Sequence, residues 1–172
     1  FKDLVNLFYK SNDFSMLANT TKVGYTYCNG VACDKFATVK YKNITTKLAK
    51  ATYEEWLTRG IPFANHMRTS VSRVFNYAIE MEHITMNPFS KIKCKKAKPR
   101  KIAWEDAEVT RFLNMAYSEY KWGHVGLIIQ MTYEWCQRLQ DIRTLEWDEI
   151  DFNHQRLHLI QDKRGVEISL PI

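Results

Sequence analysis

A run of positive charge near the middle of the chain is the feature that most limits how the chain can fold. Residues 91–101 contain seven lysines and arginines and no acidic residue. Such a run repels itself and resists burial, so it cannot form part of a hydrophobic core. We therefore expect two separately folded units, residues 1–90 and 102–172, joined by an exposed basic linker.

The same linker accounts for the net charge of the chain, which is +6. Without its seven basic residues, 18 of the 25 basic residues remain against 19 acidic ones, a balance of −1. Positive charge confined in this way favours a polyanion such as nucleic acid, although a solvated linker without a partner is the alternative. The candidate phosphate contacts in the linker are Lys93, Lys95, Lys96, Lys98, Arg100 and Lys101.

Other features exclude several classes of protein. The longest apolar stretch, residues 125–129, is too short to cross a membrane, and no signal peptide is visible. We therefore expect a cytoplasmic protein with reduced cysteines. Cys28 and Cys33 are close in sequence, but no second pair at ligand spacing accompanies them, so we expect no metal site. The chain begins at Phe1 and stops after a strand-like run, which suggests a fragment of a longer protein.

Helical patterns dominate the first unit. Apolar residues recur at helical spacing from Phe1, and a helix is predicted over residues 45–57, with a threonine cap at its start and Gly60 after its end. Residues 20–39 are ambiguous because an Asn-Gly pair interrupts the pattern. The strongest prediction is the helix that follows Pro62.

This helix has two different faces. Its apolar stripe comprises Met67, Val71, Val74, Phe75, Ala78 and Ile79. Its polar face comprises Asn65, His66, Arg68, Thr69, Ser72, Arg73 and Asn76. The polar face carries no acidic residue before Glu80, and such a surface suits phosphates and base edges. An ordinary solvated face is the alternative. The residues of this face that we expect to contact DNA are Asn65, His66, Arg68, Thr69 and Arg73.

The second unit begins with helices and ends with strands. Helices are predicted over residues 104–117 and 123–137, of which the second is more apolar and is expected to be buried, and a short helix over 140–146. The chain then alternates at period two over residues 156–160 and 166–170, and a glycine lies in the turn between them. This pattern predicts a β-hairpin.

Residues 135–151, with the sequence WCQRLQDIRTLEWDEID, resemble the first conserved box of the tyrosine recombinase (phage integrase) family. That box typically reads T-G-x-R-x-x-[ED]-[IL]-x-x-L-x-W-x-D-[IV]-[DN]. The positions that match are Arg138, Asp141, Ile142, Leu145, Trp147, Glu149, Ile150 and Asp151, with Glu149 in place of the usual aspartate. Trp135 and Cys136 replace Thr-Gly, so we expect an altered backbone just before the arginine.

The surrounding sequence extends the resemblance over residues 45–172. Lys163-Arg164-Gly165 lies where the family carries a catalytic lysine in a hairpin turn. Residues 60–66 and 74–78 resemble the family's helical core-binding domain. The resemblance implies a mainly α fold, in which a SAM-like core-binding bundle is joined to the first helices and a β-hairpin of an α+β catalytic domain. In this family the two domains form a clamp around duplex DNA.

The resemblance also implies the chemistry. The family breaks DNA without metal or other cofactor: a tyrosine hydroxyl attacks a phosphate, and the 5′-hydroxyl leaves. Arg138 would bind the phosphate oxygens, Lys163 would protonate the leaving oxygen, and Asp141 would support the site. A salt bridge between Arg138 and Asp141 and an exposed turn lysine are the plainer alternatives.

The rest of the family's active site would lie downstream of the hairpin. The His-x-x-Arg pair and the nucleophilic tyrosine are not assigned in this chain, although it contains nine tyrosines. We therefore expect this chain alone not to cleave DNA, and we expect the complete protein to act as a homotetramer on two duplexes. A non-catalytic DNA-binding regulator on the same scaffold and a helical protein-interaction module are the two other interpretations.

Overall fold

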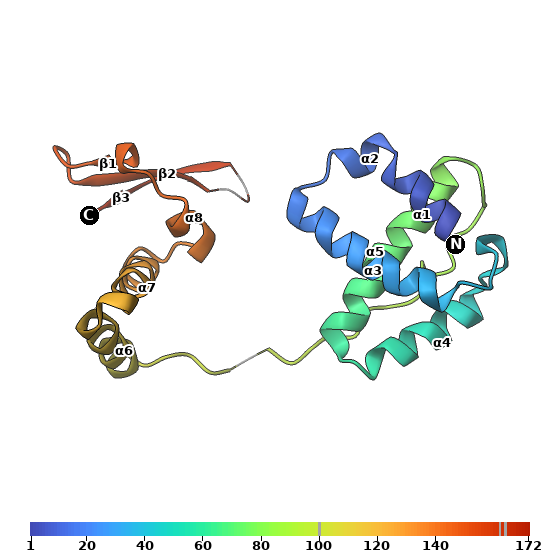
Figure 1. Cartoon of the computed structure of the whole chain (residues 1–172), viewed down its shortest axis with the longest axis horizontal. Coiled ribbons are helices and arrows are strands. Elements are labelled where there is room, and N and C mark those ends of the chain that lie inside the picture. The colour runs from blue at the N-terminus through green and yellow to red at the C-terminus, as the bar shows by residue number, and fades with distance from the viewer. Residues whose placement is uncertain (100, 162, 164) are drawn as a thin grey trace. The chain divides into compact units, whose positions relative to one another are not determined.

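The structure, a computed structural model, describes residues 1–99, 101–161, 163 and 165–172 (Figure 1). Two folded units follow each other along the chain, Phe1–Arg100 and Lys101–Ile172. The first is entirely helical in its described part, and the second contains helices and one three-stranded antiparallel sheet. The mainly α fold class expected from the sequence is confirmed. None of the described helices combines the length and apolar character that crossing a bilayer requires.

Local signals in the sequence set several helix starts in the first unit. Its helices are α1 (Lys2–Tyr9), α2 (Asn12–Ser15), α3 (Asn19–Lys35), the 3₁₀ helix η1 (Tyr41–Asn43), α4 (Thr46–Leu57) and α5 (Ile61–Glu80). The Thr45 hydroxyl accepts a hydrogen bond from the Leu48 amide at 3.2 Å, which confirms the predicted threonine cap of α4. Gly60 has φ +112°, a conformation that favours glycine, and it lets α5 begin directly after α4.

Helix α3 continues through the Asn-Gly pair that made residues 20–39 ambiguous. Asn29 is fully buried, and its side-chain oxygen accepts a hydrogen bond from the Ser70 hydroxyl of α5 at 2.9 Å. Asparagine is locally disfavoured in a helix interior. Here its hydrogen bond to α5 stabilises Asn29 within α3.

The core of the first unit is rich in aromatic rings that surround α5. Phe89 stacks on Trp56 and on Phe75, with ring centroids 5.9 and 5.8 Å apart. Ile92 is also buried in this core. Because Ile92 packs inside the first unit, the core of that unit includes a residue beyond position 90, the limit expected from the sequence. The apolar stripe predicted for α5 is buried except at Ile79, which is exposed.

The second unit begins with a capped helix and ends in the sheet. Its elements are α6 (Asp106–Ser118), η2 (Tyr120–Trp122), α7 (Gly123–Trp135), α8 (Leu139–Arg143), η3 (Trp147–Glu149), β1 (Ile150–Asp151), β2 (Arg156–Gln161) and β3 (Val166–Pro171). Glu105 is the N-cap of α6 and forms a capping box with Glu108, so the helix begins two residues after the start at residue 104 that the sequence predicts.

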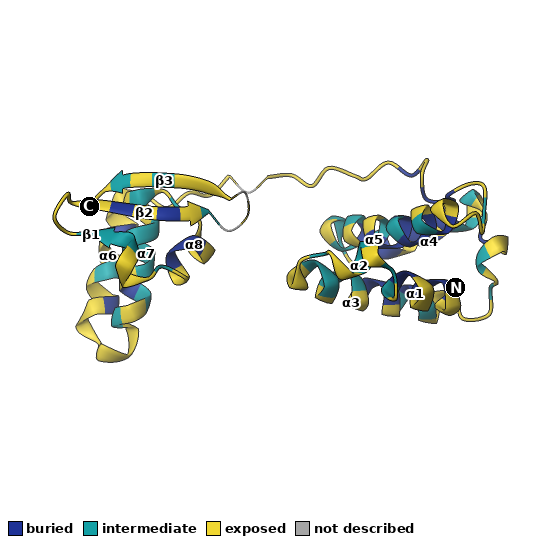
Figure 2. Cartoon of the chain, turned by 90° about the horizontal axis from the view of Figure 1, so that it is seen from above, coloured by how far each residue is buried: buried dark blue, intermediate teal, exposed yellow. Residues whose placement is uncertain are grey.

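The predicted hairpin is confirmed as β2 and β3, whose register pairs Leu159 with Ile168. Gly165 has φ +61° in the turn between them, where glycine is favoured. The short strand β1, which the sequence pattern did not predict, pairs with β2 on its other edge. Buried and exposed residues alternate along β2 (Figure 2), so one face of this strand packs inward.

The expectation that α7 is buried is wrong. Gly126 is its only buried residue, and Leu127 is 52% exposed. The apolar composition of α7 suggested burial on several sides. Its main contacts within the second unit are made with α6, α8 and η2, and large side chains such as Leu127 and Tyr133 remain exposed beyond them.

Candidate active site and nucleic-acid interface

Arg138 lies in a short extended stretch between α7 and α8. Cys136, the C-cap of α7, adopts the left-handed conformation with φ 50° and ψ 30°. Arg138 is then extended, with φ −69° and ψ 143°, and is the N-cap of α8. The box carries glycine at the position of Cys136, and glycine adopts the left-handed conformation most readily. The unusual residue therefore produces local strain at Cys136, whereas the turn itself is formed.

The Arg138 side chain is held by a buried carboxylate. Its Nη1 lies 3.6 Å from Oδ2 of Asp141, one turn later on α8. The Asp141 side chain is 2% exposed, whereas that of Arg138 is 41% exposed. A buried acid thus restrains the guanidinium from one side while much of the group faces solvent. The salt bridge with Asp141, which the sequence left open as the plainer alternative, is present. It leaves the planar, permanently charged guanidinium able to donate to two oxygens of a phosphate.

Lys163 is exposed in the turn between β2 and β3. The base of this turn is tied to the segment that precedes Arg138, because the Gln161 amide donates a hydrogen bond to Oε1 of Gln137 at 2.9 Å. This glutamine pair, which the sequence analysis did not single out, brings the hairpin to the arginine segment. Gln137 lies in the box, one residue before Arg138, whereas Gln161 is the last residue of β2, so their contact depends on how β2 packs against α8.

Tyr133, the tyrosine nearest in sequence to Arg138, is engaged elsewhere. Its hydroxyl donates a hydrogen bond to Oδ1 of Asp106 at 2.6 Å. This hydrogen bond to the neutral phenol raises the pKa of Tyr133 above its ordinary value. The hydrogen bond joins α7 to the start of α6.

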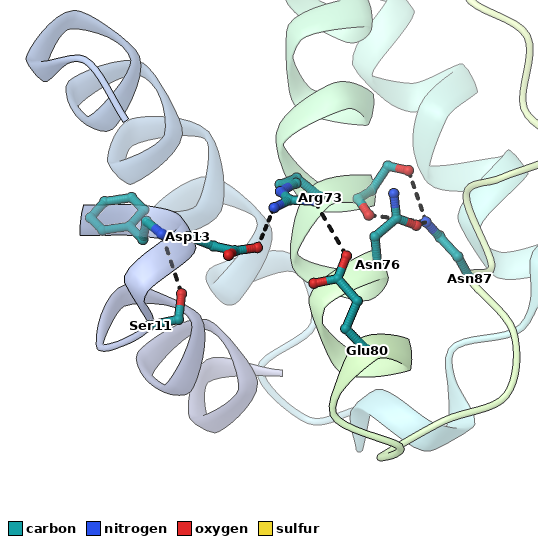
Figure 3. A network of polar contacts seen from close by, with 8 residues as sticks. Ser11, Asp13, Arg73, Asn76, Glu80 and Asn87 are labelled. Carbon is teal, nitrogen blue, oxygen red and sulfur yellow. Dashed lines mark hydrogen bonds and ion pairs between the residues drawn. The ribbon is translucent and has the colours of Figure 1, made fainter. Parts of the chain in front are cut away.

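Part of the polar face of α5 is used inside the first unit. Arg73 forms ion pairs with Asp13 of α2 and, at 3.4 Å, with Glu80 (Figure 3). Arg68 donates hydrogen bonds to the backbone carbonyls of Phe89 and Ser90 at 3.1 and 3.3 Å. The face carries no acid along α5 itself before Glu80, but the fold brings Asp13 to it.

Asparagine side chains of this face also have internal partners. Asn76 accepts a hydrogen bond from the Asn87 amide at 2.6 Å, and Asn87 also donates to the Ser72 hydroxyl (Figure 3). Ser72, predicted to be on the polar surface, is buried. Asn65 contacts Tyr53 and the backbone of Lys95.

His66 and Thr69 are the predicted DNA-contacting residues of α5 that stay exposed. The His66 ring lies against Gly24 of α3, where a Cβ atom would come within 3.1 Å of the ring. Their contact with DNA remains a prediction.

Residues 91–101, the expected basic linker, are called the basic segment. Its described lysines are all exposed: Lys91, Lys93, Lys95, Lys96, Lys98 and Lys101. Arg100, also predicted to contact DNA, lies outside the described residues. In the part of the chain that the structure describes, no group of three or more His, Cys, Asp or Glu side chains is placed to hold a metal ion, and the four cysteines carry no disulfide.

Comparison with known proteins finds sequence similarity to phage integrases. The chain is 28% identical to the integrase of Enterobacteria phage 434 and 27% identical to that of Escherichia phage lambda, each over 131 residues. The matched region covers 76% of this chain and 36% of each relative, so the chain matches about a third of the length of these integrases. No family model matches the chain.

Solved integrase structures share its fold. A lambda integrase dimer bound to a COC′ core site has a TM-score of 0.85 at 23% identity, and the match covers 99% of this chain and 48% of that one. A lambda integrase tetramer bound to a Holliday junction gives the same TM-score at 22% identity, again over 99% of this chain and 48% of that one. The Tn1549 transposon integrase in complex with a circular intermediate DNA has a TM-score of 0.71 at 14% identity, over 97% of this chain and 58% of that one.

Proposed function

We propose that this chain, a member of the tyrosine recombinase (integrase) family, is the DNA-binding part of a site-specific DNA recombinase and supplies part of its active site. The observation that carries the proposal is the setting of Arg138. A half-exposed arginine is restrained by the buried Asp141, and a glutamine pair ties its segment to the hairpin that bears Lys163. The sequence similarity to integrases favours this function over a non-catalytic regulator or a protein-interaction module.

Arg138 and Lys163 would serve two different atoms of the scissile phosphodiester. The transition state for attack on phosphorus gains negative charge, and Arg138 would donate hydrogen bonds to the non-bridging oxygens that carry it. Lys163 would give a proton to the leaving 5′-oxygen and take one from the 5′-hydroxyl during rejoining. Asp141 would act by orienting Arg138. The attacking tyrosine belongs to the family's downstream segment, so we propose that this chain alone does not cleave DNA.

The basic segment would provide much of the affinity for duplex DNA, through Lys93, Lys95, Lys96, Lys98, Arg100 and Lys101. On α5, we propose that His66 and Thr69 face the DNA, while Arg68 and Arg73 mainly hold the bundle together through their internal partners. Phosphate contacts by lysines carry little sequence information, so any selectivity within this chain would come from α5.

The complete protein would act on DNA as an oligomer. Lambda integrase has been solved as a dimer on a core site and as a tetramer on a Holliday junction. We propose a homotetramer on two duplexes for the complete protein, acting in the cytoplasm of a bacterial or phage-infected cell without a metal or other cofactor.

Binding of duplex DNA by this chain at several salt concentrations tests the first part of the proposal. We expect the chain to bind duplex DNA at low salt. The logarithm of the binding constant should fall linearly with the logarithm of the salt concentration, with a slope of about −0.9 for each phosphate contact. Replacing Lys96 and Lys98 by glutamine should make this slope shallower by about 2. The same change at Lys22 and Lys40, outside the basic segment, is the control and should leave the slope unchanged. If the chain does not shift duplex DNA even at low salt, the proposal is wrong.

A further inference from the structure

The backbone of Lys95 takes part in a closed ring of hydrogen bonds with two side chains of the first unit. The Tyr53 hydroxyl of α4 donates to Oδ1 of Asn65 on α5 at 2.7 Å. The Asn65 amide donates to the Lys95 carbonyl at 2.8 Å, and the Lys95 amide donates to the Tyr53 hydroxyl at 2.9 Å. Each member donates one hydrogen bond and accepts one, and such rings strengthen their own bonds by mutual polarisation.

The ring divides the basic segment into two parts. Residues 91–95, which we name the strap, are fixed to the first unit at both ends, because Ile92 is buried in the core and Lys95 is held by the ring. Tyr53 itself is buried, with 4% of its surface exposed, so the ring rests on a rigid part of α4. Beyond the strap, the described residues 96–99 and 101 are exposed and outside helices and strands.

A basic groove lies between the strap and α4. Its volume is about 380 Å³, and the charged side chains that line it are Lys50, Glu54, Lys91, Lys93 and Lys95. Four lysines thus face one glutamate, which leaves an excess of three positive charges around a groove whose two sides are held together by the ring. This excess of charge is complementary to a polyanion.

We propose that Tyr53 and Asn65 are positioning residues that hold the strap against α4, so that Lys50, Lys91, Lys93 and Lys95 form a preorganised surface for the sugar-phosphate backbone of duplex DNA. This inference rests on the proposed DNA-binding function. A lysine on a freely moving linker loses conformational entropy when it binds a phosphate, and this loss opposes binding. Lysines on the strap lose less freedom because their backbone is already fixed. Asn65, predicted from the sequence to contact DNA, would thus act on DNA through the strap.

The variant Tyr53→Phe tests the ring of hydrogen bonds with little change in packing, since it removes the hydroxyl oxygen and keeps the phenyl group. We expect faster hydrogen exchange at the Lys95 amide, measured without DNA. We also expect a threefold to tenfold loss of affinity for duplex DNA, about the size of one lost hydrogen bond. Tyr77→Phe, at a partly buried tyrosine of α5 outside the ring, is the matched control and should change neither quantity. Unchanged exchange at Lys95 in Tyr53→Phe overturns the inference.

A double-mutant cycle tests whether the ring acts through the lysines. Replacing Lys91 and Lys93 by glutamine should weaken DNA binding more in the wild-type chain than in Tyr53→Phe, because the strap is ordered only in the first background. Equal losses in both backgrounds overturn the inference and leave the proposed function intact. A wild-type chain that binds no duplex DNA at low salt overturns the proposed function, and this inference with it.

Discussion

Replacing Cys136 by glycine should stabilise the second unit. Cys136 holds a left-handed backbone conformation just before Arg138, with φ 50°, where a Cβ atom lies too close to the following carbonyl oxygen. Its side chain is exposed, so little buried surface is lost when it is removed. The thiol makes one weak contact, a hydrogen bond to the Tyr133 carbonyl at 3.6 Å.

The size of the effect follows from two opposing contributions. Relief of the left-handed strain favours glycine by about 1–2 kcal/mol. The greater freedom of glycine in the unfolded chain opposes it by about 0.5–1 kcal/mol. The balance predicts a stabilisation of about 0.5–1 kcal/mol, which for a unit of this size corresponds to a rise in melting temperature of about 2–8 °C.

Thermal unfolding followed by tryptophan fluorescence would measure this, because four of the five tryptophans lie in the second unit. Cys136→Ala is the matched control, since it removes the thiol but keeps the Cβ atom, and it should stay within about 0.5 kcal/mol of the wild type. If Cys136→Gly melts no higher than Cys136→Ala, the strain assigned to this residue is not present.

Three other substitutions test separate parts of the structure. Asp13→Asn should lower the free energy of unfolding by less than about 1 kcal/mol, because the ion pair with Arg73 is partly exposed. It should also tighten binding of duplex DNA by removing a negative charge, and weaker binding in a gel-shift titration would contradict this. Asn87→Ala should destabilise the first unit by about 1–3 kcal/mol in urea unfolding, because buried partners lose their hydrogen bonds. A change below about 0.5 kcal/mol, the usual range of surface substitutions, would contradict it. Asp106→Asn should lower the raised pKa of Tyr133, so that phenolate absorbance appears at lower pH than in the wild type; an unchanged tyrosine titration would exclude the hydrogen bond as the cause.

The elements that the sequence predicted correctly depend on local patterns. Thr45, the cap of α4, accepts a hydrogen bond from an amide only three residues later. In the β2–β3 hairpin, apolar residues alternate with polar ones and Gly165 lies in the turn. The box around Arg138 likewise combines residues that are close in sequence. These features need no knowledge of distant contacts, so a single sequence is enough to find them.

The elements that it missed depend on partners far along the chain. Asn29 remains in a helix because of Ser70, 41 residues away, and Arg73 is paired with Asp13, 60 residues away. Periodicity correctly separated most of the apolar stripe of α5 from its polar face. It could not show that most of the polar residues would bind partners on other segments. Of the residues predicted to contact DNA from that face, His66 and Thr69 are the ones that remain exposed.

Formation of covalent protein–DNA adducts by the complete protein tests most directly whether Arg138 stabilises the transition state of a phosphotyrosyl transfer, as proposed. On a DNA substrate that traps the covalent intermediate, Arg138→Ala should reduce the rate of adduct formation by about 10²–10³-fold, the usual effect of removing one preorganised donor, while duplex binding is largely retained. The control Arg143→Ala, at the exposed end of the same helix, should form adducts at nearly the wild-type rate. Adduct formation by Arg138→Ala at the wild-type rate would contradict the claim.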